Sequence, residues 1–183
     1  MKIIAAELPD CLLIEPARFG DQRGFFQENF RTADYRRAGI NDDLVQDNWS
    51  RSLKGVLRGM HFQHTAPQGK LISVIRGEIF DVAVDIRKDS ASFGQWQGMV
   101  LSEHKPQQLW LPPGFAHGFL VLSDVADVIY KTSSYYDAAC EGSFSWNDPK
   151  LAISWPASPL HLSVKDTNAP GFHQAMAILG KPE

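Results

Sequence analysis

Gly77-Glu78-Ile79-Phe80-Asp81-Val82-Ala83-Val84-Asp85-Ile86 is the stretch of the chain that decides the fold. Its residues alternate with a period of two, which is typical of a strand and not of a helix. One face of that strand is apolar and carries Phe80, Val82, Val84 and Ile86, whereas the other carries Asp81, Ala83 and Asp85. We expect the apolar face to pack in a core and the acidic face to line a cavity.

Short apolar runs of the same kind lie on both sides of this stretch. Prolines and glycines separate them, as at Arg76-Gly77-Glu78 and Pro112-Pro113-Gly114. Consecutive short strands joined by tight turns favour an all-β antiparallel barrel or a jelly-roll sandwich. The expected strands cover residues 55–62, 70–76, 78–87, 97–101, 108–111, 118–122 and 127–132.

Helices are expected only at the periphery. One short helix is predicted over residues 33–38, where Gly39 ends it, and a terminal helix over residues 172–179, where Gly180 ends it. Residues 146–159 are rich in Pro, Trp and Ser and are expected to wrap the barrel as irregular structure. No internal repeat or linker divides residues 1–183, so the chain is interpreted as a single domain.

Composition limits the classes of function. With 183 residues, 44% hydrophobic and 11% aromatic, the chain is long and apolar enough to bury one core. A net charge of −3 provides no general basic surface for nucleic acid or an anionic membrane, so any bound phosphate must be held by local clusters. No apolar run approaches a membrane span or a signal peptide, and we expect a soluble, cytoplasmic protein. Cys11 and Cys140 are too far apart in sequence for a close-spaced metal motif and are interpreted as buried or incidental thiols.

Polar side chains inside a small barrel are the informative ones, because burying them is costly unless they are paired. The candidates on strand segments are Arg58, His61, Lys70, His117 and Tyr130. Arg58 and His61 are three positions apart, so in a regular strand their side chains would point to opposite faces. They share one pocket only if Gly59 marks a bulge or a bend.

Several long motifs make the chain similar to a known family. The segments that carry the similarity are Arg23-Gly24-Phe25-Phe26-Gln27-Glu28, Gln46-Asp47-Asn48-Trp49-Ser50, Gly55-Val56-Leu57-Arg58-Gly59-Met60-His61-Phe62-Gln63, Phe80-Asp81-Val82-Ala83-Val84-Asp85-Ile86-Arg87, Pro113-Gly114-Phe115-Ala116-His117-Gly118-Phe119, Tyr130-Lys131-Thr132, Trp146-Asn147-Asp148-Pro149 and Ser163-Val164-Lys165-Asp166. In order and over roughly residues 1–167, they closely resemble the dTDP-4-dehydrorhamnose 3,5-epimerases.

The resemblance implies a cupin jelly roll, a homodimer and a reaction without a cofactor. That reaction inverts carbons 3 and 5 of dTDP-4-dehydro-6-deoxy-D-glucose to give dTDP-4-dehydro-L-rhamnose, a precursor of cell-surface polysaccharide. The C4 ketone acidifies the hydrogens on both carbons, so removal of a proton leaves an enolate. Such a site needs a base, an acid on the opposite face and cations or donors near the oxyanion.

By the same resemblance, His61 is the base, Asp166 orients its ring, and Tyr130 is the opposing acid. Arg58 and Lys70 face the enolate oxygen or the diphosphate, and His117 holds the diphosphate or the sugar. The residues implied for the nucleotide are Arg23, Glu28, Gln46, Asp47, Asn48, Glu141 and Lys165, of which Arg23 and Glu28 reach the site of the neighbouring subunit. The roles of Asp81 and Asp85 stay open.

Three other functions compete with this hypothesis. A metal-dependent cupin commonly uses two histidines separated by one residue, and here Gln63 occupies the place of the second. A non-catalytic sugar-nucleotide-binding protein is disfavoured by the presence of His61, Lys70, Tyr130 and Asp166 together. An epimerase that inverts only one carbon is the runner-up, because the motif spacing does not separate it from the double epimerase.

Overall fold

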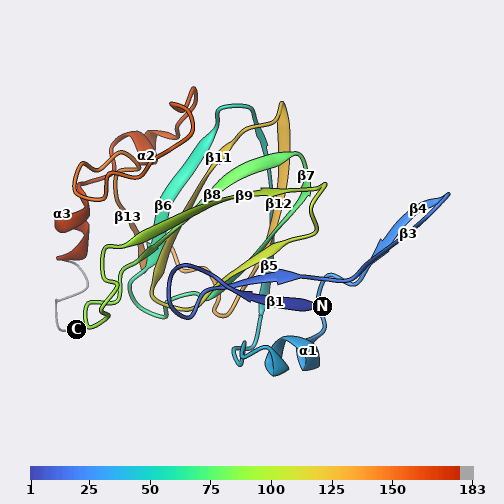
Figure 1. Ribbon diagram of the computed structural model, residues 1–183. Coiled ribbons are helices and arrows are strands. Elements are labelled where there is room, and N and C mark those ends of the chain that lie inside the picture. The colour runs from blue at the N-terminus through green and yellow to red at the C-terminus, as the bar shows by residue number, and fades with distance from the viewer. Residues whose placement is uncertain (178–183) are drawn as a thin grey trace.

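The computed structural model describes residues 1–177 as two large antiparallel sheets that face each other, a separate two-stranded hairpin, and short helices at the edges (Figure 1). The first sheet has the order β1-β2-β10-β7-β12-β5, formed by β1 (Lys2–Ala5), β2 (Leu12–Glu15), β10 (Gln108–Leu111), β7 (Lys70–Arg76), β12 (Val125–Thr132) and β5 (Gln46–Leu53). The second has the order β13-β6-β11-β8-β9, formed by β13 (Glu141–Ser143), β6 (Leu57–Gln63), β11 (Phe115–Val121), β8 (Glu78–Asp85) and β9 (Trp96–Ser102). The predicted all-β jelly roll is confirmed.

The space between the two sheets holds the main core. Inward residues of both sheets fill it, among them Ile72, Ala83, Leu109, Phe119 and Val128. Their alternation along each strand is the two-residue period seen in the sequence. The face of β8 that carries Asp81 and Asp85 therefore points into the barrel, and both carboxylates are fully buried.

The other face of β8 is also covered. Val82, Val84 and Ile86 pack under the C-terminal part of the chain, together with Phe144 and Phe172. Residues 146–159 are irregular and lie over this sheet, as expected from their composition. They lead to two short helices, α2 (Val164–Thr167) and α3 (Phe172–Met176).

The outer face of the six-stranded sheet is only partly covered. Helix α1 (Thr32–Arg37) buries Tyr35 against Ile14 and Trp110. Farther along the same sheet, Trp49 and Leu53 remain 66% and 64% exposed. A hairpin formed by β3 (Arg18–Asp21) and β4 (Gly24–Gln27) projects away from the barrel (Figure 1).

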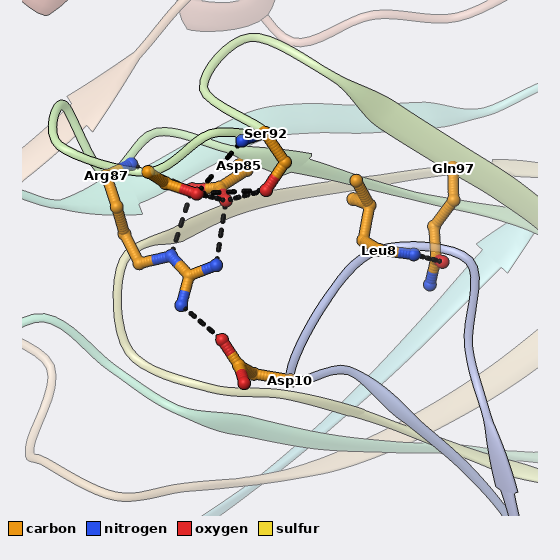
Figure 2. A network of polar contacts seen from close by, with 7 residues as sticks. Leu8, Asp10, Asp85, Arg87, Ser92 and Gln97 are labelled. Atoms are coloured by element: carbon orange, nitrogen blue, oxygen red, sulfur yellow. Dashed lines mark hydrogen bonds and ion pairs between the residues drawn. The ribbon is translucent and has the colours of Figure 1, made fainter.

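A polar network fastens the loop between β1 and β2 to strands β8 and β9 (Figure 2). The guanidinium of Arg87 donates to Asp85 at 3.0 and 2.8 Å and to Asp10 at 2.7 Å. Asp85 also accepts from the hydroxyls of Ser90 and Ser92, each at 2.7 Å. Both oxygens of this buried carboxylate are thus engaged in holding the fold, which assigns Asp85 a structural part.

The sequence located the strands with a clear apolar pattern better than the short or polar ones that lack it. The runs 70–76 and 108–111 match β7 and β10 residue for residue, whereas β11 begins earlier than expected, at Phe115. The strand β5 was not predicted, because its polar sequence Gln46–Leu53 gives no apolar period. The short strands β1, β2, β3, β4 and β13 also lacked a clear period.

Two of the three helices within residues 1–177 were predicted. Helix α1 agrees with the expected 33–38, and Gly39 follows it with φ of +99°. The predicted terminal helix begins at Phe172 as expected, but α3 ends at Met176, and the predicted residues 178–179 lie outside the described part of the chain. Helix α2 was missed because four residues show no helical period. In the described part of the chain, no helix has the length and apolar character needed to cross a membrane.

A bulge in β6 brings Arg58 and His61 to the same side of the sheet. His61 pairs with His117 and Arg58 pairs with Phe119, so β6 has two residues where β11 has one. Gly59 stands in the bulge with φ of +128°, and a Cβ there would lie 2.6 Å from the Cα of Gly118. The bulge that the parity of the two side chains required is confirmed.

Replacing Gly59 by alanine should therefore destabilise the protein. The added methyl meets the backbone of β11 and the φ disfavours any L-residue, so we expect a loss of about 3 kcal/mol in the free energy of unfolding, measured with urea. Gly39→Ala is the matched control, because Gly39 also has positive φ but its added methyl would enter open space, with no atom beyond its chain neighbours within 4 Å. That variant should lose only about 1 kcal/mol. Equal losses in both variants would contradict the account of the bulge.

Candidate active site

A cavity of about 190 Å³ opens between the two sheets where β6 ends and β7 begins. Side chains from both sheets and from the connecting segments surround it. The lining residues are Gln46, Asn48, His61, Phe62, Gln63, Gln68, Lys70, Tyr130, Tyr136 and Glu141. Six of them were predicted from the sequence as site residues: Gln46, Asn48, His61, Lys70, Tyr130 and Glu141.

His61 is held by a carboxylate from the distant C-terminal segment. Its Nε2 lies 2.5 Å from Oδ1 of Asp166, whose side chain is 3% exposed. Burial opposes ionisation of Asp166, but the hydrogen bonds from His61 and Ser163 outweigh it and lower the pKa of the carboxyl. A charged Asp166 accepts the Nε2 proton of a neutral imidazole, which leaves Nδ1 with the free lone pair.

Asp166 itself is fixed by the start of α2. Ser163 is the N-cap residue, and its hydroxyl accepts from the backbone N–H of Asp166 at 3.0 Å. The same hydroxyl donates to Oδ2 of Asp166 at 2.8 Å. Ser163 therefore orients Asp166 through both the backbone and the side chain of that residue, and only Oδ1 is left for His61.

Lys70 places an amine in the wall of the cavity. It begins β7 and is 8% exposed. Burial lowers the pKa of its ammonium to about 8, and the charge of Asp81 partly offsets that effect. Below that pH, the cavity contains a poorly solvated positive charge, which attracts an anionic ligand or a developing oxyanion.

His117 lies beside His61 on the neighbouring strand and makes a second histidine–aspartate contact. Its Nε2 is 2.8 Å from Oδ2 of Asp81, which is fully buried. Within the described residues, no group bonds to the other oxygen of Asp81. Asp81 thus differs from Asp85. It faces the charged groups of the site, and only one of its two oxygens is hydrogen-bonded within the described residues.

Tyr130 stands on β12, in the sheet opposite His61. Burial raises the pKa of its phenol, although the nearby charge of Arg58 acts in the other direction. Arg58 crosses toward the same sheet, where its Nε donates to the hydroxyl of Ser52 at 3.0 Å. The phenol is therefore protonated at neutral pH and lies near a cation.

Two site residues pair with each other, and one neighbour was missed. Lys165 forms an ion pair with Glu141, and the hydroxyl of Tyr136 donates to the same carboxylate at 3.2 Å. Tyr136 was not predicted as a site residue, since a tyrosine in a polar loop shows no pattern that separates it from a surface residue.

The remaining predicted residues lie away from the cavity in this chain. Asp47 points to the opposite face of β5 from Gln46 and Asn48, where it bonds to Lys131 at 2.8 Å. Arg23, at the tip of the projecting hairpin, pairs with Asp21, and Glu28 pairs with Arg31.

The arrangement suits proton transfer at a bound anionic ligand. A histidine with an orienting carboxylate lies in one wall and a protonated phenol in the other, so the two can act on opposite faces of a ligand between them. Cationic Lys70 and Arg58 can meet negative charge. Among residues 1–177, no three His, Cys, Asp or Glu side chains gather as a metal site.

Comparisons with known proteins agree on one family. The family model described as dTDP-4-dehydrorhamnose 3,5-epimerase matches residues 5–174. The dTDP-4-dehydrorhamnose 3,5-epimerase of Salmonella typhimurium is 50% identical over 179 residues, which cover 96% of this chain and 98% of that enzyme.

Solved structures extend the comparison. The dTDP-6-deoxy-D-glucose-3,5-epimerase of Legionella pneumophila, crystallised with dTDP-4-keto-L-rhamnose, has a TM-score of 0.94 and 50% identity over 97% of this chain and 96% of that chain. ChmJ, a 3'-monoepimerase from Streptomyces bikiniensis in complex with dTDP-quinovose, has a TM-score of 0.88 but only 34% identity, over 94% of this chain and 89% of that chain.

The buried amine of Lys70 predicts a specific dependence of stability on pH. The unfolded chain keeps this proton up to the ordinary pKa of 10.5, whereas the native state releases it near pH 8. Between these values the unfolded state binds more protons, so the free energy of unfolding should rise with pH, by up to about 3 kcal/mol from this group. Urea unfolding of the wild type and of Lys70→Met, compared from pH 7 to 11, isolates the contribution.

The exposed Lys150 supplies the control. Lys150→Met should follow the wild-type curve in parallel, whereas the stability of the wild type relative to Lys70→Met should grow above pH 8. Parallel curves for wild type and Lys70→Met would contradict the burial of a destabilised ammonium.

Proposed function

We propose the function from the family: the chain belongs to the dTDP-4-dehydrorhamnose 3,5-epimerases. It converts dTDP-4-dehydro-6-deoxy-D-glucose to dTDP-4-dehydro-L-rhamnose by inverting carbons 3 and 5, in the biosynthesis of dTDP-L-rhamnose. The observation that carries the mechanism is the placement of His61 and Tyr130 in opposite walls of one cavity.

Proton abstraction falls to His61. Nδ1 of the neutral imidazole takes a proton from the carbon next to the C4 ketone, and the electrons of that C–H bond form the C=C bond of an enolate. The carbonyl electrons move to the oxygen, where the charges of Lys70 and Arg58 stabilise them. Asp166 stabilises the imidazolium that results.

Reprotonation falls to Tyr130. Its phenol delivers a proton to the face opposite His61, the enolate electrons form the new C–H bond, and the ketone returns. A proton from solvent restores the phenol and His61 loses its own, so the reaction is an isomerisation without change in oxidation state. No cofactor is required by this balance, and none is proposed.

The nucleotide is assigned to side chains that line the cavity or contact residues next to it. Gln46, Asn48, Glu141 and Lys165 offer amide, carboxylate and ammonium groups for the nucleoside. His117, with its tautomer set by Asp81, holds the diphosphate or the sugar. This assignment is supported by the contacts that gather these groups and by the family to which the chain belongs.

A homodimer completes the site in this proposal. The outer face of the six-stranded sheet exposes Trp49 and Leu53, and a second copy covers that surface. The hairpin β3–β4 projects beyond its own barrel (Figure 1), with Phe25 and Phe26 64% and 68% exposed. In the proposed dimer it extends toward the partner's cavity and presents Arg23 to the diphosphate. Glu28 directly follows β4 and is therefore placed near the partner together with the hairpin.

The double epimerase is favoured over the enzyme that inverts one carbon. Identity to the Salmonella and Legionella 3,5-epimerases is 50%, against 34% for the 3'-monoepimerase. We place the enzyme in the cytoplasm, where its product is a precursor of cell-surface polysaccharide.

Tyr130→Phe separates proton removal from proton delivery. The change removes one hydroxyl and keeps the ring, so His61 should still form the enolate and return solvent deuterium to its own face. We expect exchange with retained configuration, while the rate of inversion falls by roughly 10²–10⁴-fold. NMR of dTDP-4-dehydro-6-deoxy-D-glucose incubated with the variant in D2O reports both processes at carbons 3 and 5.

His61→Asn is the matched variant. It should abolish exchange at both carbons, because a single base serves both. Normal inversion by Tyr130→Phe would show that another group delivers the proton, and exchange in His61→Asn would show that another residue is the base.

The dimer has its own test in solution. Trp49→Glu places a charge on the exposed sheet face and should convert a dimer to monomers, as measured by sedimentation equilibrium. Turnover of the sugar nucleotide by these monomers should be impaired. Val100→Glu, at a 49% exposed apolar position of β9 in the other sheet, should leave the dimer intact. A wild-type monomer, or dissociation by both changes alike, would contradict the proposed interface.

A further inference from the structure

Residues 133–137 follow β12 and include Tyr136, which lines the cavity; we call them the rim segment. Three glutamines, one at the start of β5 and two between the end of β6 and the start of β7, bind it. Gln68 donates to the carbonyl of Ser134 at 2.9 Å, and Gln46 accepts from the backbone N–H of Tyr136 at 3.0 Å. Gln63 makes the most extensive contact.

The carboxamide of Gln63 brackets one residue of the rim segment. Its Nε2 donates to the carbonyl of Tyr135 at 3.4 Å, and its Oε1 accepts from the backbone N–H of Asp137 at 2.8 Å. These are the two peptide groups on either side of Tyr136. The same Nε2 donates to the carbonyl of Ala66 at 3.0 Å, so Gln63 also ties the rim segment to the loop after β6.

Only an amide of this length meets all three contacts. The site presents two carbonyl acceptors and one N–H donor, and a carboxylate cannot donate to the carbonyls. Gln63 is 5% exposed, so water does not readily replace a lost partner. Gln63 also lines the cavity, but both ends of its amide are already bonded to the backbone of the rim segment and of the loop after β6.

The bracketed residue faces the site. Tyr136 lines the cavity together with His61, Lys70 and Tyr130, and its hydroxyl donates to Glu141. The tyrosine is 53% exposed, so packing alone does not fix it. The position of Tyr136 depends on the hydrogen bonds from Gln63 to the peptide groups on either side of it and on the hydrogen bond from its own backbone N–H to Gln46.

We propose that Gln63 is a positioning residue: it fixes the rim segment so that Tyr136 contacts the bound sugar nucleotide, and it thereby sets the affinity for the nucleotide and not the rate of proton transfer. The inference rests on the proposed function, because it assigns Tyr136 to binding of that substrate. The hydrogen bonds that orient His61 and Asp166 come from each other and from Ser163, outside the rim segment, so the base and its orienting carboxylate stay in place without Gln63.

Gln63→Met tests the inference in the full-length enzyme. Methionine fills a similar volume without hydrogen bonds, so KM and the Kd for dTDP alone should each rise about ten-fold, while kcat stays within about two-fold. Gln63→Glu retains the acceptor for Asp137 and should give a smaller rise. Steady-state kinetics with dTDP-4-dehydro-6-deoxy-D-glucose and calorimetric titration of dTDP supply the values.

Gln97→Met is the control for loss of a buried glutamine. Gln97 is 2% exposed and accepts from the backbone N–H of Leu8 at 2.8 Å, outside the rim (Figure 2). This variant should keep wild-type KM. An unchanged KM in both Gln63 variants, or a fall in kcat that equals the fall in kcat/KM, would overturn the inference.

A double-mutant cycle with Tyr136→Ala shows whether Gln63 acts through the ring. In the Tyr136→Ala background, Gln63→Met should raise KM by less than about three-fold, because the group that it positions is already absent. Full additivity of the two changes would overturn the inference. Failure of the wild type to turn over the sugar nucleotide would instead refute the proposed function, so the two failures are distinguishable.

Discussion

The hydrogen bond between His61 and Asp166 is the contact on which the rest of the site depends. It joins β6 to a residue 105 positions later in the chain. The C-terminal part of the chain therefore has two functions. The aromatic and aliphatic side chains of its irregular segment cover the outer face of the five-stranded sheet, and helix α2, which follows, contains the buried carboxylate of Asp166. Ser163 makes that delivery specific, since it leaves one carboxylate oxygen for the imidazole.

A second constraint comes from the barrel itself. Two facing apolar sheets tolerate charge only where it is paired or open to a ligand. Asp85 is satisfied by Arg87 and two serines and stabilises the fold, whereas Asp81 bonds only His117 within the described residues and lies close enough to Lys70 to favour its charge. Two aspartates on one strand face thus serve different purposes because of what surrounds them.

Much of the barrel interior and of the candidate site was predictable from the alternation of apolar and polar residues along the strands. Alternation along residues 77–86 predicted that Asp81 lines a cavity, and the cost of burying polar groups singled out His117 and Tyr130 on their strands. The opposite parity of Arg58 and His61 indicated the bulge at Gly59 that the strand register contains. Strand β5 was not predicted because polar residues line both of its faces. Tyr136 and the contacts of Gln63 were missed for a different reason: hydrogen bonds from a side chain to the backbone of a segment 74 residues away leave no periodic signal in a single sequence.

The central claim is that one base and one acid in this barrel invert two carbons without a metal. The direct measurement is turnover of dTDP-4-dehydro-6-deoxy-D-glucose in D2O by chelator-treated protein of verified metal content, followed by NMR. The account predicts deuterium at both carbons 3 and 5 of the product, at the rate of untreated enzyme. Loss of exchange on chelation with recovery on adding Mn²⁺ or Zn²⁺, or deuterium at a single carbon, would contradict it.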